Sequence, residues 1–287
     1  TTYHYRFSAR NEVTAEEESG PVFGEEGAFR TFAFPTPSAP CTNDALRLGP
    51  SSLLPDCRGH EMVSPPDKEG GEIYVLLDVP NYPAAINQGA ATGDAFTYSS
   101  YRAFADPTSA PYTSQYLARR TAGGWDNEQI SPARDRPVIA GLETQYRAFS
   151  DDLSDGWLVS DSEAPLTEGA LPGYRNLYRR DNQTGAYEAQ CPAPPMSVAA
   201  KNFNLEPQGH SADGSHLIFR ATDALTPDAI PGITQLYECV NGTDLRLVSV
   251  LANGEPSPTG ASAGTARGGL GGFGHRKNNL AGAVSGD

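Results

Sequence analysis

Three short stretches of this 287-residue chain contain residue types that can do chemistry, but each lacks the surroundings which that chemistry needs. Residues 151–156 read Asp-Asp-Leu-Ser-Asp-Gly, whereas a calcium-binding EF-hand loop needs oxygen ligands where this chain has Leu153 and Ser162. Residues 260–264 fit Gly-x-Ser-x-Gly, yet no apolar strand precedes them. Residues 269–274 fit Gly-x-Gly-x-x-Gly, yet a basic, turn-prone stretch follows them where phosphate binding needs a helix. We therefore predict turns and loops here, in preference to a calcium site, a nucleophile elbow or a phosphate loop.

The five histidines lie at positions 4, 60, 210, 216 and 275, without the spacing of a zinc site. His210 and His216 flank one predicted turn, and we expect both to face solvent; a metal site formed by this surface pair is the alternative. Carboxylates are plentiful, but no pair can be assigned as acid and base without knowing which ones lie close together. We identify no catalytic, cofactor-binding or metal-binding residue, and an enzymatic activity stays open.

The four cysteines carry information about the compartment. Cys41 and Cys57 bracket one loop, and we predict that they form a disulfide, which stabilises a loop of this length by about 3 kcal/mol. Disulfides persist in oxidising compartments outside the cytoplasm. Cys191 and Cys239 fall at non-equivalent places, and the sequence leaves open whether they pair. Residues 182–184 and 241–243 fit the N-glycosylation acceptor, but turn chemistry explains both.

Composition limits the fold and the partners. The chain has 30 Gly and 24 Pro, which favours a turn-rich β protein over one built from long helices. A net charge of −14 counts against nucleic acid and anionic membrane surfaces as partners. No run approaches the roughly 20 apolar residues that a membrane-spanning helix needs.

The predicted elements that position these residues recur along the chain. Two independent sequence patterns each appear three times, at intervals of about 60 residues. A small polar turn followed by an apolar strand occurs at residues 91–98, 151–159 and 212–219. A strand containing leucine and tyrosine follows at residues 115–119, 176–180 and 235–239. Each copy continues through a glycine turn into another strand, so one repeat contains four antiparallel strands, the pattern of a β-propeller blade. Residues 283–287 match the start of a fourth copy.

The first turn of each repeat carries the residues with the plainest local role, namely Asp94, Asp152, Asp213 and Gly214. An aspartate there accepts hydrogen bonds from backbone N–H groups two residues on, and glycine tolerates positive φ. The alternative is that the three aspartates surround a metal ion or a substrate. In the third strand we expect tyrosines 178 and 237 to lie in the core between blades, and arginines 179 and 180 to form a solvated face.

The repeat at 211–219, followed by Gln-Leu-Tyr at 235–237, resembles the WD40-like, TolB-type β-propeller repeat. Thr92 and Leu153 depart from the usual Asp and Gly of that repeat. The stretch 57–71 is similar to the start of large exported bacterial proteins in which a propeller follows fibronectin-like modules. Residues 1–11 resemble the last two strands of a fibronectin type III-like sandwich.

These patterns predict an all-β chain: the C-terminal strands of a fibronectin type III-like domain at 1–35, a Pro-rich linker and Cys-bounded loop at 36–57, and an incomplete propeller at 58–287. The propeller part would hold about three four-stranded blades and a stub, so we expect both ends of the chain to be cut from a longer polypeptide. The resemblance implies a non-catalytic extracellular or cell-surface module that binds a protein, peptide or glycan. The alternatives are a hydrolase or lyase acting on polysaccharide and a structural envelope protein.

Overall fold

The computed structural model describes residues 2–9, 21–31, 41–54, 57–73, 87–109, 113–133, 135 and 145–261. Residues 36–40 of the predicted linker, the motif at 269–274 and the fourth copy at 283–287 lie outside these residues. The chain forms two compact units, Thr1–Met62 and Val63–Asp287. The described residues contain strands and short 3-10 turns without an α-helix, so the prediction of an all-β chain is confirmed for them.

The first unit contains a two-stranded ribbon and a disulfide-closed loop. Strand β1 (Thr2–Ala9) pairs antiparallel with β2 (Val22–Arg30), and the rings of Tyr3 and Phe29 stack with centroids 5.3 Å apart. A disulfide joins Cys41 to Cys57, whose Cα atoms are 5.5 Å apart. The loop inside it holds two 3-10 turns, η1 (Asp44–Leu46) and η2 (Gly49–Leu53).

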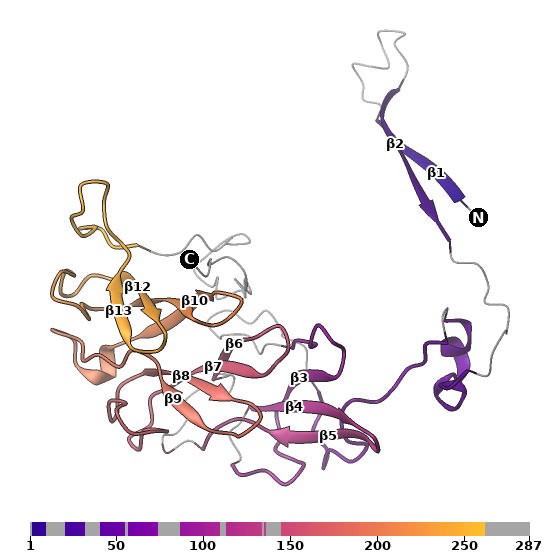
Figure 1. The fold of residues 1–287 in the computed structure, drawn as a ribbon, viewed down its shortest axis with the longest axis horizontal. Coiled ribbons are helices and arrows are strands. Elements are labelled where there is room, and N and C mark those ends of the chain that lie inside the picture. The colour runs from indigo at the N-terminus through magenta and orange to yellow at the C-terminus, as the bar shows by residue number, and fades with distance from the viewer. Residues whose placement is uncertain are drawn as a thin grey trace. The chain divides into compact units, whose positions relative to one another are not determined.

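The second unit contains three consecutive antiparallel sheets, and each corresponds to one sequence repeat (Figure 1). The first sheet comprises β3 (Ala95–Ser100), β4 (Ser114–Thr121) and β5 (Gly124–Gln129). The second comprises β6 (Tyr146–Phe149), β7 (Asp155–Ser160), β8 (Asn176–Asp181) and β9 (Tyr187–Ala189). After η3 (Ala200–Asn202), the third comprises β10 (Leu205–His210), β11 (His216–Ala221), β12 (Gln235–Val240) and β13 (Asp244–Leu247). Each strand pairs with its neighbours in the sequence.

The first sheet differs from the predicted four-stranded repeat. Among the described residues, its leading side pairs with β3 through two isolated bridges, Ile73 to Ser100 and Gly89 to Phe96, with backbone hydrogen bonds from Thr97 to Gln88 and from Ala90 to Ala95. These bridges occupy the place of the fourth strand.

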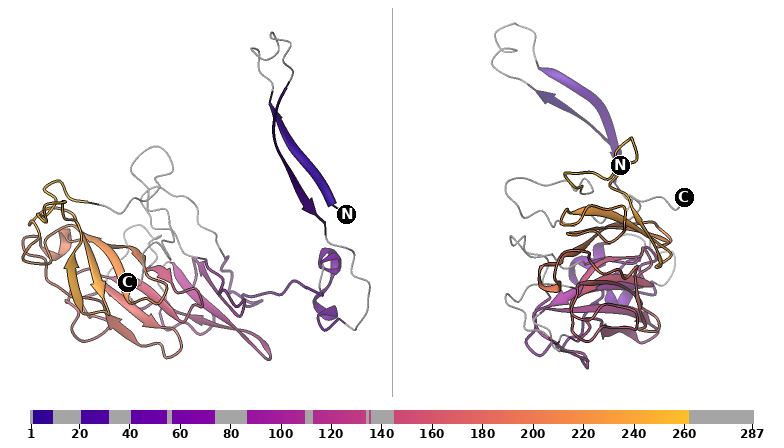
Figure 2. Two further views of the ribbon diagram at one scale, coloured as in Figure 1. Left: turned by 45° about the horizontal axis from the view of Figure 1, so that its top comes forward. Right: turned by 90° about the vertical axis from the view of Figure 1, so that its left-hand side faces the viewer.

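The three sheets follow one another side by side (Figure 2), and two apolar clusters pack each sheet against the next. Leu117 and Ile130 of the first sheet meet Tyr146, Phe149 and Tyr178 of the second. Between the second and third sheets the cluster includes Trp157, Val159, Leu177, Leu217, Phe219 and Tyr237. Burying each such side chain stabilises the fold by roughly 1.5–3 kcal/mol, so these boundaries are the main source of stability in the unit.

A tyrosine in the third strand of each sheet anchors the loop that precedes it. The Tyr116 hydroxyl accepts a hydrogen bond from the Phe104 amide at 2.8 Å and donates to the Arg102 carbonyl at 3.1 Å. The Tyr237 hydroxyl does the same with the Leu225 amide and the Asp223 carbonyl, at 3.0 and 3.1 Å. The Tyr178 hydroxyl is bonded to the Leu166 backbone, again twelve residues upstream.

The predicted solvated positions of Arg180 and His210 are wrong. Arg180 is 5% exposed and His210 is 1% exposed. The reason is that the second sheet has a neighbour on both faces, so side chains on either side of β8 can become buried. The imidazole of His210 in turn lies against Trp157, with its Nδ1 bonded to the Ser211 carbonyl at 2.8 Å. Arg179 and His216 remain partly accessible, paired with Asp155 and Glu238 respectively.

Candidate functional site

The aspartates of the predicted turns act within their own hairpins. Asp152 Oδ1 accepts hydrogen bonds from the Ser150 hydroxyl at 2.8 Å and from the Ser154 amide at 3.0 Å. Asp213 Oδ1 accepts from the Ser211 hydroxyl at 2.6 Å and the Ser215 amide at 3.1 Å. The hydrogen bonds from these serines lower the pKa of Asp152 and bring that of Asp213 to about 2.

The other turn residues also have local partners. The Thr92 hydroxyl donates to Asp94 in the first repeat. Gly214 has a φ of +70° in the third. In each turn, the aspartate carboxylate finds its hydrogen-bond donors within the same turn. Among the described residues, no group of three or more His, Cys, Asp and Glu side chains is placed to hold a metal ion.

A buried carboxylate that the sequence did not reveal lies in the loop after β11. Asp223 is fully buried and accepts hydrogen bonds from the amides of Ser197, Val198 and Gly232 at 2.6, 2.9 and 2.6 Å. Burial acts to raise the pKa of Asp223, but these hydrogen bonds outweigh it and hold the pKa at about 2. Asp223 therefore holds two loops together, and nothing in its sequence context distinguishes it from a solvated turn residue.

An ion-pair cluster joins the second sheet to the third at their leading strands. Glu206 on β10 contacts Arg147 on β6 at 3.0 Å and Arg175 at 2.5 Å. All three side chains are largely buried, and a buried carboxylate needs such partners to remain charged.

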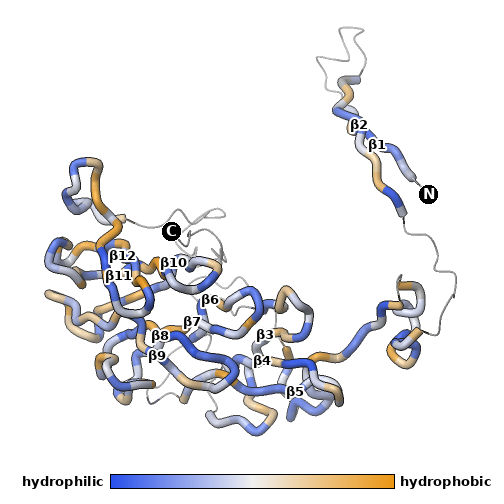
Figure 3. The backbone as a smooth tube through the Cα atoms, viewed as in Figure 1, coloured by the Kyte–Doolittle hydropathy of each residue, from blue (hydrophilic) through white to orange (hydrophobic). Residues whose placement is uncertain are grey.

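Two hollows lined by described residues of the second unit lie where the last strand of one sheet meets the next sheet. The first cleft, between the first and second sheets, has a volume of about 620 Å³. Its polar lining residues are Asp106, Thr108, Asn127, Glu128, Gln129, Ser131, Arg180 and Tyr187. Strand β5, on one side of this cleft, is predominantly hydrophilic (Figure 3). Ala105 and Asp106, on its rim, have positive φ values of 55° and 49°, a conformation that costs energy in non-glycine residues and is frequent at ligand sites.

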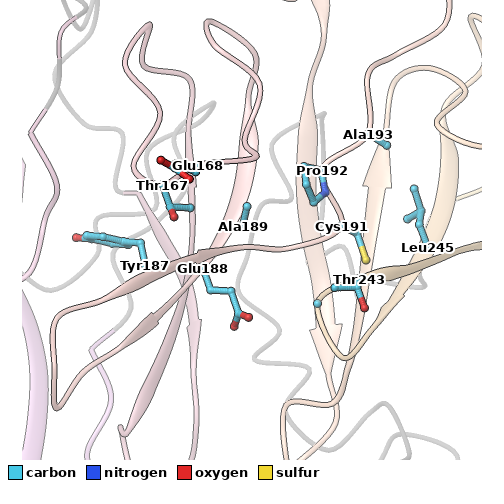
Figure 4. Close-up of a pocket in the computed structure, with 11 residues that line it drawn as sticks. Thr167, Glu168, Tyr187, Glu188, Ala189, Cys191, Pro192, Ala193, Thr243 and Leu245 are labelled. Atoms are coloured by element: carbon cyan, nitrogen blue, oxygen red, sulfur yellow. The ribbon is translucent and has the colours of Figure 1, made fainter.

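The second cleft, between the second and third sheets, has a volume of about 460 Å³ (Figure 4). It is lined by Thr167, Glu168, Tyr187, Glu188, Ala189, Cys191, Pro192, Ala193, Gly242, Thr243 and Leu245. The ring of Tyr187 points away from Cys191 and Leu245, toward the other side of β9.

The two clefts occupy corresponding places in consecutive repeats. Tyr178 in the second sheet corresponds to Tyr237 in the third, so Arg180 and Cys239, each two residues further on, are equivalent. Gln129 pairs with Tyr116 as Ala189 pairs with Tyr178, which makes Ser131 equivalent to Cys191. The same registers match Glu128 with Glu188 and Tyr187 with Leu245.

A disulfide lies at the wall of the second cleft where the first has a charged side chain. Cys191 is bonded to Cys239, with Cα atoms 5.8 Å apart, and this bond joins the second sheet to the third. In the first cleft the equivalent residues are Ser131 and Arg180. The comparison shows that packing at this boundary does not require an arginine, although burying a charge is costly unless it is paired.

Arg180 is held in place by partners on both sides. Its Nη1 donates to Asn182 Oδ1 at 2.8 Å, and its Nη2 donates to Glu128 Oε1. The other oxygen of Glu128 accepts from Arg119 at 3.1 Å. No polar atom of the described residues accepts a hydrogen bond from the buried Nε of Arg180. One donor of a nearly buried guanidinium thus remains unused at the wall of the first cleft.

No protein-family model matches the chain, and no curated protein matches it either. Among solved structures, the chain is similar to the crystal structure of TolB from Acinetobacter baumannii, at 15% sequence identity and a TM-score of 0.33. The match covers 60% of this chain and 33% of that chain, so this chain spans about a third of the length of TolB.

The two disulfides indicate an oxidising compartment. Within the described ranges, no helix is long and apolar enough to cross a bilayer.

Proposed function

We propose that this chain is a non-catalytic binding module that works outside the cell or at its surface, and that the first cleft is its binding site. The observation that carries the proposal is the difference between the two corresponding clefts. One has a disulfide at its wall, whereas the other is a larger hollow whose wall holds a buried arginine with an unused donor. A concave site with a few convergent polar groups is the usual form of a ligand site.

The scaffold for this site would be part of a β-propeller. Three antiparallel sheets with strands in sequence order, each packed face to face on the next, support this arrangement. In the same proposal, residues 58–287 are the propeller part, residues 36–57 the connection, and residues 1–35 the last strands of a fibronectin type III-like domain. The exposed aromatic residues of β1 and β2 support this last assignment, since an isolated hairpin is marginally stable.

Binding is favoured over hydrolysis by the state of the carboxylates. The described aspartates with a shifted pKa, at positions 135, 152, 181, 213 and 223, are all shifted downward by hydrogen bonds that they accept. A hydrolytic general acid needs the opposite, a pKa raised by its surroundings. These side chains therefore act as charged acceptors that hold loops in place.

The test is direct binding of the full chain to arrays of glycans and peptides. We expect saturable binding to at least one class, weakened by substitutions that line the first cleft. Absence of binding to both classes would contradict the proposed function.

A further inference from the structure

We infer that the first cleft takes a neutral, polyhydroxylated ligand, that is, an oligosaccharide without acidic groups; this inference rests on the proposed function and specifies its ligand. The local charges are the first argument. Two guanidinium groups, of Arg119 and Arg180, pair with the carboxylate of Glu128, and the carboxylate of Asp106 also lines the cleft. Their formal charges cancel, which leaves a neutral site on a chain whose net charge is −14.

The hydrogen bonds of Arg180 disfavour an anionic ligand. Carboxylates and phosphates bind best to two parallel N–H groups of one guanidinium. In Arg180 each terminal nitrogen already donates one hydrogen bond, to Asn182 or to Glu128, and Nε has no acceptor among the described residues. An anion bound to the remaining N–H groups would face the carboxylate of Glu128, whereas a neutral hydroxyl or ether oxygen accepts from the same groups without that repulsion.

The rest of the lining suits hydroxyl groups. A hydroxyl both donates and accepts, so a sugar needs acceptors close to each donor. Glu128 and Asp106 supply carboxylate oxygens, while Thr108 supplies a hydroxyl at the exposed rim. Tyr187 adds an aromatic ring with a polar tip, on which the apolar face of a sugar ring can lie.

The second cleft differs from the first at several equivalent positions. It has Leu245 in place of Tyr187, Ala189 in place of Gln129, and the disulfide in place of Arg180 and Ser131. Because the strands around both clefts pair in the same register, residues of the second cleft can be substituted into the first without changing how the strands pair.

The experiment measures binding of the full chain to a panel of neutral oligosaccharides (gluco-, manno-, galacto- and chito-oligosaccharides), with uronic acid oligomers and peptides as the other arms. We expect binding in the neutral arm. Two variants copy the second cleft: Tyr187→Leu, and the double substitution Ser131→Cys with Arg180→Cys. Each should weaken binding by about tenfold or more, whereas Glu188→Gln, in the second cleft at the position equivalent to Glu128, should bind as the unmodified chain does.

The outcomes separate the inference from the proposed function. Binding confined to peptides or to acidic oligomers overturns the inference and leaves the binding module standing; binding in no arm overturns both. Unchanged neutral-sugar binding by a folded variant overturns the inference. Should the variants fail to fold, hydrogen exchange on the unmodified chain decides the matter: the sugar should protect residues 127–133 and 180–187, and protection confined to other segments contradicts the assignment.

Discussion

The indole ring of Trp157 stacks on the imidazole ring of His210 across the boundary between the second and third sheets, with ring centroids 4.2 Å apart. The same indole covers Gly214, because a Cβ atom added at Gly214 would lie 2.8 Å from Trp157 Cζ2. The turn of the third repeat is thus shaped to receive a side chain from the second. This contact makes a nominally local turn residue part of the packing between sheets.

The first prediction concerns this contact. Gly214→Ala should lower the free energy of unfolding by about 2–5 kcal/mol, the sum of about 1–2 kcal/mol for positive φ and about 1–3 kcal/mol for overpacking against Trp157. Gly93→Ala is the matched control, since Gly93 has a φ of +76° with nothing within 4 Å of its added Cβ. In urea denaturation, Gly93→Ala should lose only the part of the free energy of unfolding that a positive φ costs. Equal losses for the two variants would show that Trp157 does not confine Gly214.

The buried carboxylate gives the second prediction. The pKa of Asp223 in the folded chain, about 2, lies below the value near 3.9 of an unfolded aspartate. Its contribution to stability is therefore complete above about pH 4–5 and is lost as the pH falls toward 2. Asp223→Asn should destabilise the second unit by about 1–3 kcal/mol at pH 7 and flatten the fall of stability in acid. The measurement is the free energy of unfolding between pH 2 and 7; an unchanged acid profile would refute the assignment.

The third prediction separates the two disulfides. Replacing Cys191 and Cys239 by serine opens a loop with a sequence separation of 48 and should cost about 4 kcal/mol in the second unit. Replacing Cys41 and Cys57, separated by 16, should cost about 3 kcal/mol in the first unit. Calorimetry of the full chain reports both. A shift of the second unit's transition in the Cys41/Cys57 variant would show that the two units unfold together.

The fourth prediction tests the loop anchors. Tyr237→Phe leaves the Leu225 amide and the Asp223 carbonyl without the hydroxyl that joins them, and should cost about 1–3 kcal/mol. Tyr174→Phe retains the ring contact with Phe203 and should change stability by less than about 0.5 kcal/mol. Denaturation of both variants, with hydrogen exchange at Leu225, measures the difference. Normal protection of that amide in Tyr237→Phe would argue against the anchor.

The sequence predicts local features well. The hairpin turns around Asp152 and Asp213 follow from residue types a few positions apart, and repetition then identifies three equivalent sheets. Features that depend on contact between repeats were not predictable in this way. The burial of Arg180 follows from a neighbouring sheet on each face, and no nearby residue indicates it.

The candidate site was missed for the same reason. Its walls come from residues about 50 positions apart, such as Glu128 and Arg180, and each looks like an ordinary charged strand residue in the sequence. The sequence left open whether Cys191 pairs with Cys239, because the two cysteines lie at different places in their respective repeats. Only the packing of one sheet's last strand on the next sheet brings the two together.

The constant twelve-residue interval between each third-strand tyrosine and the amide that it anchors has a practical consequence for engineering. The interval between the preceding strand and the anchored amide differs in length among the repeats: it is longer between β7 and Leu166 than between β3 and Phe104 or between β11 and Leu225. The second repeat therefore shows that this interval takes extra residues with the anchor kept, whereas Arg102 and Asp223, whose carbonyls accept from the tyrosines, are positions that a grafted peptide has to leave in place.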